Sequence, residues 1–379
     1  MPSDTFSVAN VRRVLVIKLR HHGDVLLAAP VLSMLQRLAP QCEIDALIYS
    51  DTVPMLTGNP HLAQLHVIDR NWKKQGVLRQ AAAEWRLLSQ LRARHYDLVI
   101  HLSVHKRGAW LTRLLRPRWS VAPRIHAAGR FIARFWANSF THFYAAQSHP
   151  DRHTVESNLD SLRALGLTPL AEDKRVVLVP GAAAEARVDA LLASHGMQAG
   201  RFIHIHPASR WLFKCWPTDR VAALCHLLTG EGWPIVLTCA PDAREMALLR
   251  TIFAELGKLD PPATGSSKNS ALVTRRIVDF SGQLTLKELA ALSARAKLFV
   301  GVDSAPMHIA AAMGTPTVAI FGPSGDREWG PWNVTHRVVA STTHACRPCG
   351  RAGCNDSKIS ECLTTLPVTQ VYAACAELL

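Results

Sequence analysis

No apolar run in the sequence reaches the roughly 20 residues needed to span a membrane, and residues 25–32 are broken by Pro30. Residues 1–10 are polar and lead directly into a strand-like segment, without the apolar core of a signal peptide. The chain has nine cysteines, and in the absence of a secretory signal these indicate reduced thiols. We therefore expect a cytoplasmic protein.

Cofactor motifs are missing as well. Gly230 and Gly232 precede a strand-like run instead of following one, so they cannot place a pyrophosphate on a helix N-terminus as a dinucleotide fingerprint does. The sequence has no phosphate-binding P-loop motif. These absences argue against a nicotinamide-dependent dehydrogenase.

Acidic residues are few relative to basic ones. The chain has 43 Lys and Arg against 29 Asp and Glu, a net charge of +14, and it has no acidic residue at all between Leu98 and Pro150. That stretch alternates basic with aromatic residues: Lys106, Arg107, Arg113, Arg116, Arg118, Arg124, Arg130 and Arg134 with Trp110, Trp119, Phe131, Phe135 and Trp136. A solvated basic face is one interpretation, and a surface that meets an anionic membrane is the other. The lack of nearby acids favours the membrane surface.

Short β-branched runs alternate with helical patterns, which predicts an α/β fold with parallel sheets covered on both faces. The runs are residues 14–19, 44–49, 65–68 and 97–102, and then 202–206, 235–239, 276–280, 298–302 and 317–321. Each set opens with a strand, a loop and a helix, so we expect two doubly wound domains facing a central cleft.

The expected boundaries follow from these two sets. The first domain is residues 1–180, closed by a strand at 176–179, and residues 181–200 form the linker. The second domain is residues 201–364, followed by a C-terminal helix, 365–379, that packs back on the first domain. Residues 256–270, rich in Gly, Pro and Ser, predict a surface loop.

The loop after the first strand, KLRHHGD at residues 18–24, is the first candidate site, because ligands of doubly wound sheets bind where strands end. Gly23 permits an unusual turn. Asp24 either caps the following helix or, with Arg20, His21 and His22, contacts sugar hydroxyls and phosphate. Spacing alone favours the cap, whereas the crowding of polar groups favours a ligand site.

The second candidate follows the first strand of the second domain. Ser209 and Lys214 in this loop could contact a diphosphate, with Lys214 offsetting the charge on a leaving nucleotide. A surface lysine beside packed tryptophans is an equal alternative.

The third candidate is a helix start after a strand. Asp303, Ser304 and Ala305 open that helix, whose free N–H groups attract anions, and His308 lies one turn on. Capping alone explains Asp303 and Ser304 but not the whole cluster.

A fourth candidate is a segment of four cysteines, Cys346, Cys349, Cys354 and Cys362. Four thiolates can bind zinc tetrahedrally, but only the first pair has a typical spacing. A structural zinc, a tight loop with free thiols and an oxidised artefact stay open, and the zinc is not the favoured interpretation. We assign the segment no catalytic part.

In this order and spacing, the motifs resemble the heptosyltransferase family of lipopolysaccharide synthesis, glycosyltransferase family 9. The resemblance runs from about residue 14 to the C-terminal helix and rests on these pieces: Gly23-Asp24 with Pro30, Lys214 with Trp216-Pro217, GVDSAPMH at 301–308, and residues 153–167. Within the family, His21-His22 and the closing segment that ends SECL at 360–363 look most like heptosyltransferase III.

The resemblance implies a GT-B fold, with the acceptor bound by the first Rossmann-like domain and the nucleotide sugar by the second. It implies ADP-L-glycero-β-D-manno-heptose as donor, a heptose of the phosphorylated lipopolysaccharide inner core as acceptor, inversion, and no metal or other cofactor. Asp24 matches the catalytic base and Lys214 the lysine at the donor phosphates. The matching donor-binding positions are Ser209, Lys214, Asp303, Ser304, Ala305 and His308. Some relatives hold the ribose with a glutamate after the 235–239 strand, where this chain has Ala240-Pro241-Asp242, so the ribose ligand is left unassigned.

The basic N-terminal half agrees with that acceptor, since charge would concentrate the enzyme at the anionic cytoplasmic face of the inner membrane. The acceptor contacts that we predict are Arg20, His21, His22, Gly23, Arg107 and Arg113. Three other functions stay open: transfer of heptose or another sugar to a different glycan or protein, nucleic-acid binding, and an idle scaffold. No nucleic-acid motif supports the second, and the presence of Asp24 and Lys214 argues against the third.

Overall fold

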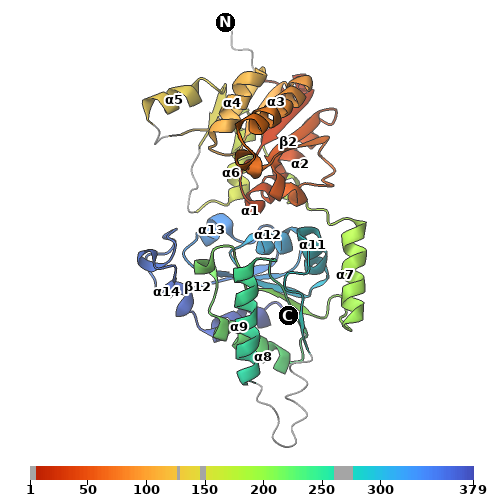
Figure 1. Cartoon of the computed structure of the whole chain (residues 1–379), viewed down its shortest axis with the longest axis vertical. Coiled ribbons are helices and arrows are strands. Elements are labelled where there is room, and N and C mark those ends of the chain that lie inside the picture. Colours follow the sequence, from red (N-terminus) through yellow and green to blue (C-terminus); the bar gives the residue numbers. More distant parts are fainter. Residues whose placement is uncertain (1–5, 126–128, 146–150, 260–275) are drawn as a thin grey trace, which may run out of the picture. The chain divides into compact units, whose positions relative to one another are not determined.

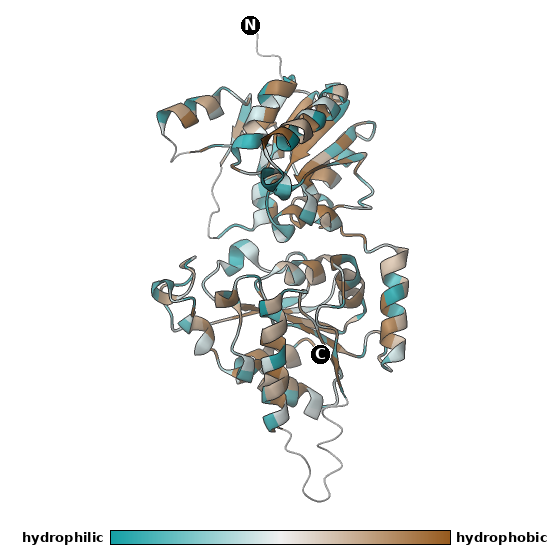
Figure 2. Cartoon of the chain, in the orientation of Figure 1, coloured by the Kyte–Doolittle hydropathy of each residue, from teal (hydrophilic) through white to brown (hydrophobic). Residues whose placement is uncertain are grey.

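The computed structural model describes residues 6–125, 129–145, 151–259 and 276–379. It divides into two compact units, Met1–Val179 and Pro180–Leu379, each built on a parallel six-stranded sheet (Figure 1). Apolar residues concentrate in the strands of both sheets (Figure 2). Such continuous apolar strands are typical of sheets that helices cover on both faces.

The first unit has the strand order β3-β2-β1-β4-β5-β6. Its strands are β1 Arg13–Ile17, β2 Glu43–Tyr49, β3 Gln64–Ile68, β4 Leu98–His101, β5 Trp119–Pro123 and β6 His142–Tyr144. The sequence did not predict β5 and β6. The prediction of a strand at residues 176–179 is wrong: these residues form no strand, and the sheet ends at β3 and β6.

The helices of the first unit are α1 His22–Leu26, α2 Ala29–Leu38, α3 Val77–Ala93, α4 Lys106–Leu115, α5 Arg130–Ala137 and α6 Thr154–Arg163. Pro30 stands in the first turn of α2, where its missing N–H leaves no helical bond unmade. The chain therefore forms two short helices after β1, and the turn between them follows the polar loop at residues 18–21.

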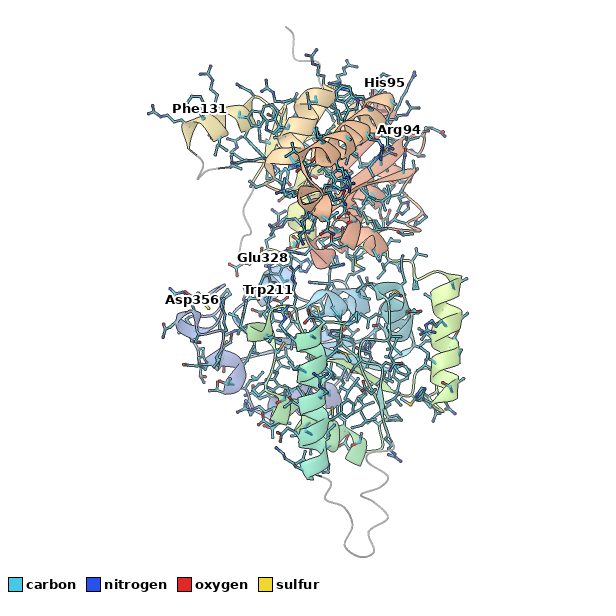
Figure 3. The ribbon with its side chains drawn as sticks, viewed as in Figure 1. Arg94, His95, Phe131, Trp211, Glu328 and Asp356 are labelled. Carbon is cyan, nitrogen blue, oxygen red and sulfur yellow. The ribbon has the colours of Figure 1, made fainter. Side chains whose placement is uncertain are left out.

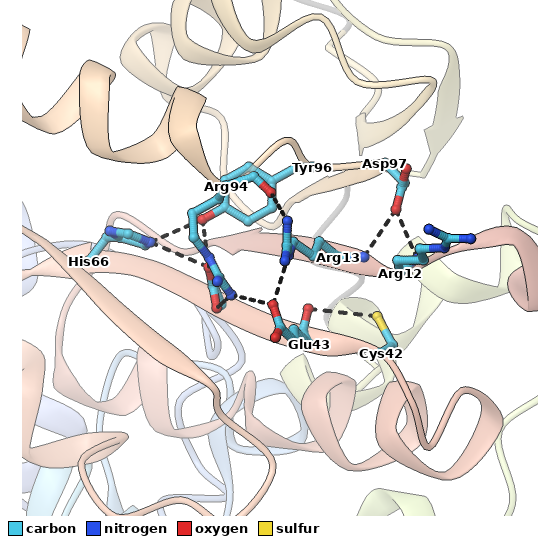
Figure 4. Close-up of polar contacts among 9 residues, drawn as sticks. Arg12, Arg13, Cys42, Glu43, His66, Arg94, Tyr96 and Asp97 are labelled. Carbon is cyan, nitrogen blue, oxygen red and sulfur yellow. Dashed lines mark hydrogen bonds and ion pairs between the residues drawn. The ribbon is translucent and has the colours of Figure 1, made fainter.

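Carboxylates at the amino-terminal edge of this sheet serve the fold (Figure 4). Asp45 is fully buried and accepts hydrogen bonds from Arg94 Nε and the Tyr96 hydroxyl, both at 2.7 Å. Burial alone would raise the pKa of Asp45, but the bonds from His66, Arg94 and Tyr96 outweigh it and lower that pKa. Asp97 accepts from the backbone N–H groups of Arg12 and Arg13 at 2.8 and 3.1 Å, respectively.

The second unit repeats the topology with the order β12-β11-β10-β7-β8-β9. Its strands are β7 Ile203–His206, β8 Ile235–Leu237, β9 Ile277–Asp279, β10 Leu298–Val302, β11 Thr317–Phe321 and β12 His336–Ala340, of which only β12 was not predicted. Its helices are α7 Ala182–Ser194, α8 Thr218–Gly230, α9 Ala243–Leu259, α11 Leu286–Arg295, α12 Ala305–Ala312, α13 Asp326–Trp329, α14 Glu361–Thr364 and α15 Val368–Ala376.

Both ends of the second unit differ from expectation. Most of the expected linker, residues 181–200, is α7, which buries Val188 and Leu192 against Phe202 and Leu292 of the same unit. The C-terminal helix α15 packs within its own unit against α8, β11 and β12, because its apolar face covers that sheet. Residues 256–259 continue α9, and the rest of the expected surface loop, 260–270, lies outside the described residues. No helix within the described ranges is long and apolar enough to cross a membrane.

Candidate functional site

Each sheet has one point at which the strand order reverses: between β1 and β4 in the first unit, and between β7 and β10 in the second. The loops that leave the carboxyl ends of two such strands run in opposite directions, which opens a crevice where ligands of doubly wound sheets bind. The loops singled out from the sequence, after β1, β7 and β10, all leave from these two points.

In the first unit, Asp24 lies in the first turn of α1. His21 occupies the N-cap position, without a capping bond from its side chain, and Asp24 stands three residues further on, so Asp24 is not the N-cap residue that spacing alone favoured. Gly23 is helical, and the unusual turn expected there is absent from the described loop. The Asp24 side chain is 13% exposed and accepts a hydrogen bond from Arg20 Nε at 3.3 Å. A carboxylate at this position is stabilised by the positive end of the helix dipole.

Behind this loop, a buried lysine fixes its position. Lys18 Nζ donates to the carbonyl of Leu102 and to Asn158 Oδ1, both at 3.0 Å. Asn158 Nδ2 in turn donates to the carbonyl of Leu27 at 2.9 Å. Burial lowers the pKa of Lys18 to about 8, against the opposing effect of the nearby Asp24 charge. The network thus ties the ends of β1 and β4 and the α1–α2 turn to α6.

Residues that the sequence analysis missed complete this end of the sheet. The guanidinium of Arg70 lies 3.9 Å from the centre of the Tyr49 ring and donates to the carbonyl of Arg20 at 3.1 Å. Arg70 also pairs with Asp51 at 3.2 Å, whose carbonyl accepts from His22 Nε2 at 2.8 Å. No motif marks these residues, and the only available signal was that they follow the ends of β2 and β3.

The pKa of His105 is lowered in part by four basic side chains around it. His105 caps α4 and contacts the Tyr49 hydroxyl at 3.2 Å. Burial is the largest cause that lowers the pKa of His105, followed by the charges of Arg107, Lys73, Arg20 and Arg70. We call the four charged groups, with Asp24 beside them, the cationic rim: Arg20, Arg70, Lys73 and Arg107. Its chemistry suits a phosphorylated or otherwise anionic ligand.

The two arginines of α4 that were predicted to contact the acceptor, Arg107 and Arg113, lie near opposite ends of that helix. Arg107, in the first turn, is paired with Glu84 and belongs to the cationic rim. Arg113 lies two turns further, where its guanidinium is 5.4 Å from the Phe135 ring centre and donates to the carbonyl of Asn138 at 3.5 Å. There it lines a shallow hollow of about 250 Å³ with Ser120 and Thr141, which stand where β5 and β6 begin. The structure therefore places Arg113 away from Asp24.

In the second unit, Lys214 and Asp303 meet although 89 residues separate them. Lys214 ends a short 3₁₀ helix, Leu212–Lys214, after β7, and Asp303 directly follows β10. Lys214 Nζ lies 2.5 Å from Asp303 Oδ2, with the side chains 22% and 8% exposed. Lys214 is thus held in place by an ion pair, close in the chain to the buried Trp216.

The start of α12 lies beside this pair. Ser304 is the N-cap residue, but its hydroxyl donates to the carbonyl of Val302 at 3.2 Å instead of accepting from the first turn. Pro306, the second residue of the helix, has no N–H, and the N–H of Met307 donates to the carbonyl of Ser304 at 3.2 Å. The N–H of Ala305 is therefore the one in this turn that is placed to meet an anion. His308, one turn on, is buried with its ring centre 6.4 Å from that of Trp329.

The remaining predicted residue, Ser209, is buried in the loop after β7. Its hydroxyl accepts from the backbone N–H of Trp211 at 3.4 Å, and Trp211 itself is about half exposed. Figure 3 labels Trp211 at the surface of the second unit. Ser209 therefore shapes the loop that carries Lys214.

Glu245 was left unassigned by the sequence. It stands in the first turn of α9, and its carboxylate turns back to accept from the backbone N–H of Ala240 at 3.0 Å. Burial raises the pKa of Glu245. This places a buried carboxylate at the end of β8, the neighbour of β7.

All nine cysteines are free thiols. Among the described residues, no group of three or more His, Cys, Asp or Glu side chains is arranged to hold a metal ion. Burial is the largest cause that raises the pKa of Cys362, which Arg347 opposes and the thiols of Cys354, Cys349 and Cys346 reinforce.

Comparisons with known proteins point to one family. Residues 84–360 match the family model of glycosyltransferase family 9 (heptosyltransferase). The chain is 34% identical over 315 residues to lipopolysaccharide heptosyltransferase 3 of Escherichia coli, covering 83% of this chain and 85% of the relative.

Two solved structures have the same fold. The glycosyltransferase family 9 structure from Veillonella parvula superposes with a TM-score of 0.76 at 21% identity, covering 99% of both chains. The E. coli heptosyltransferase WaaC with ADP-2-deoxy-2-fluoro heptose superposes with a TM-score of 0.66 at 21% identity, covering 96% of this chain and 99% of that one.

Proposed function

The chain belongs to glycosyltransferase family 9 and has the GT-B fold, and on that premise we propose that it moves a heptose from ADP-L-glycero-β-D-manno-heptose to a heptose of the lipopolysaccharide inner core. The observation that carries the proposal is the Lys214–Asp303 pair beside the start of α12, in a chain 34% identical to an E. coli lipopolysaccharide heptosyltransferase 3. A lysine next to the positive end of a helix is suited to a diphosphate.

On the donor side, the start of α12 and Lys214 bind the two phosphates of ADP. Asp303 holds the ammonium of Lys214 in position and offers its second oxygen to a sugar hydroxyl. Ser209 and His308 fix the two loops. As the bond between the anomeric carbon and the β-phosphate oxygen breaks, ADP leaves with the electron pair, and Lys214 stabilises the charge that develops on it.

On the acceptor side, Asp24 is the general base. It takes the proton of the acceptor hydroxyl while that oxygen bonds to the anomeric carbon from the face opposite ADP, which inverts the configuration. The cationic rim binds the phosphates of the inner core, with Arg20 placed to orient Asp24. Arg113, which lies elsewhere on α4, is not part of this proposal.

The acceptor is a lipid, so the enzyme works in the cytoplasm at the anionic face of the inner membrane. The excess of 43 basic over 29 acidic residues supports such an association through electrostatic attraction. We propose that the reaction needs no metal ion, because Lys214 and the positive end of α12 supply positive charge at the leaving phosphate.

The test is release of ADP from ADP-heptose in the presence of EDTA, with core lipopolysaccharide that lacks its last heptose as acceptor. We expect release that depends on the acceptor, and a heptosylated product by mass spectrometry. Release only after a divalent metal is added would contradict metal independence. Binding of ADP-heptose without acceptor-dependent release would move the acceptor to another glycan or to a protein.

Asp24→Asn tests the base within the same assay. The amide keeps the shape of the side chain but cannot take a proton, so turnover should fall by about 10²- to 10⁴-fold, with binding of ADP-heptose unchanged. Glu185→Gln is the matched control, since it also removes a carboxylate from the first turn of a helix, α7, in the second unit. Near-normal turnover of Asp24→Asn would exclude Asp24 as the base.

A further inference from the structure

Large apolar side chains are exposed together on α4 and α5 of the first unit. Phe131 is 93% exposed, Trp110 56%, Leu114 41% and Ile132 39%. Figure 3 labels Phe131 on α5, pointing away from the sheet. Several exposed apolar side chains on adjacent helices indicate a surface that contacts something else.

The helix α5 is held rigidly from beneath. Trp136 is 3% exposed, its Nε1 donates to the carbonyl of Pro123 at 2.8 Å, and its ring packs against His101 and Phe140. Trp136, an aromatic of the stretch favoured for membrane contact, therefore belongs to the core. Phe135 joins α5 to α4, with its ring centre 4.6 Å from that of Trp110.

Because Trp136 faces the core, the opposite side of α5 faces solvent. Arg130, Phe131 and Arg134 are all exposed and lie on the side of the helix opposite Trp136, since they are six, five and two residues away from it, respectively, at 100° per residue. The exposed Arg113 of α4 lies beside Phe135, with its guanidinium 5.4 Å from the ring centre. The apolar residues are thus flanked by guanidinium groups.

Charge decides which partner fits this surface. The segment between Leu98 and Pro150, which supplies both helices, has no acidic residue. A second copy of the chain would bring one cationic surface against another, which like-charge repulsion disfavours. An anionic lipid leaflet satisfies both features, because aromatic side chains enter the headgroup region while arginines bind the phosphates.

We propose that the α4–α5 face, defined by Trp110, Arg113, Leu114, Arg130, Phe131 and Arg134, docks on an anionic membrane surface. Phe131 enters the boundary between headgroups and acyl chains, and Arg130 and Arg134 bind lipid phosphates on either side. The inference deepens the proposed function and rests on it, since a lipid-linked acceptor is what brings the enzyme to a membrane.

The experiment is flotation of the full-length protein with phosphatidylcholine vesicles, with and without phosphatidylglycerol. We expect binding only to the anionic vesicles, weakened about tenfold in Phe131→Ser and in the double variant Arg130→Gln/Arg134→Gln. The matched controls lie in the second unit. Ile359→Ser removes an apolar side chain that is 58% exposed, and Arg201→Gln/Arg250→Gln removes the same charge from exposed positions. Both controls should bind the anionic vesicles as the unmodified protein does.

Three results would overturn the docking surface: no binding to anionic vesicles, full binding by Phe131→Ser, or equal loss in the arginine control. Self-association that Phe131→Ser abolishes in sedimentation velocity would assign the face to a second copy instead. Transfer to deacylated core oligosaccharide, measured in the same variants, should be unchanged. If the unmodified protein showed no such transfer, that would count against the proposed function. The docking surface would then be decided by the vesicle binding alone.

Discussion

The ammonium of Lys214 lies 2.5 Å from Asp303 Oδ2, across the point where the strand order of the second sheet reverses. The pair sets two opposite charges beside the N-terminus of α12. If ADP phosphates bind there, the two residues must affect ADP affinity in opposite directions, because Lys214 attracts phosphate and Asp303 repels it.

We therefore expect Lys214→Ala to weaken ADP binding by about 10- to 100-fold, the loss of one charge-assisted hydrogen bond. Asp303→Asn should tighten binding of ADP itself by about 2- to 5-fold, while slowing transfer, because the sugar loses a contact. Isothermal titration calorimetry with ADP measures both. Weakening of similar size in both variants would mean that the pair only supports the loop.

The Lys18–Asn158 contact makes a second prediction, about position instead of charge. Asn158→Ala leaves the buried ammonium of Lys18 and the carbonyl of Leu27 each short of a partner. We expect a loss of about 2 kcal/mol in the free energy of unfolding, and a lower kcat because the Asp24 loop loosens. Affinity for ADP should not change, because its proposed site lies in the other unit.

Urea denaturation and steady-state kinetics measure these effects. Ser157→Ala is the control, since it removes a hydroxyl from the same helix whose contact with the carbonyl of His153 is long, at 3.4 Å. If the Asn158→Ala protein were as stable and active as that control, the Lys18–Asn158 network would not position the Asp24 loop.

Of the twelve strands in the described residues, nine followed from the sequence, because each is an apolar run bounded by polar loops. Of the three that were missed, two carry weaker signals: β6 has three residues, His142–Tyr144, while β5 includes Ser120 and ends at Pro123. The linker at 181–200 was misjudged because α7 is largely alanine, so its composition does not reveal that Val188 and Leu192 are buried.

The site was predictable where neighbouring residues in the chain form it. Asp24, Lys214 and Ser304 stand in the segments that follow β1, β7 and β10, and the sequence points to all three. Arg70 and His105 were missed and Glu245 was left unassigned, because each is brought in by a different strand, and only the sheet order makes them neighbours of these segments. Arg113 shows the reverse: it shares a helix with Arg107, but about two turns of helix separate them.

Gly108 provides a third prediction, about packing beneath α4. A Cβ built on Gly108 would lie 1.8 Å from His101 Nε2, and His101 is fully buried beside Trp136 and Phe140, so it cannot move away. Gly108→Ala should therefore lower the free energy of unfolding by about 3 kcal/mol. Urea denaturation followed by circular dichroism measures the change.

The control for Gly108 is Gly257→Ala in α9. Among the described residues, no heavy atom other than those of its chain neighbours and the surrounding helix backbone lies within 4 Å of a Cβ built there. Alanine in that helix should stabilise the protein by about 0.5 to 1 kcal/mol, because glycine has the greater conformational freedom when unfolded. Equal effects of the two substitutions would show that the close approach of Gly108 to His101 is not a constraint.

Buried histidines predict how stability depends on pH. Burial lowers the pKa of His101 in the first unit, and of His206 in the second, from 6.5 to about 3. Below pH 6.5 the unfolded chain takes up protons on these residues and the folded protein does not, so stability falls as pH falls from 6.5 toward about 3. Each histidine should contribute about 1.4 kcal/mol per pH unit within that window.

Urea denaturation at a series of pH values between about 6.5 and 5 follows the buried histidines together, including His204, whose pKa burial also lowers. Asp45, whose pKa is lowered from 3.8, loses its contribution only at lower pH. His101→Leu keeps an apolar side chain in the cluster with Trp136 and Phe140 and removes one titrating group. Its free energy of unfolding should depend on pH less steeply than that of the unmodified protein, by about 1.4 kcal/mol per pH unit. An identical pH dependence in the two proteins would mean that His101 takes up a proton in the folded protein as it does in the unfolded one. Gly108 would then not pack against a neutral imidazole ring.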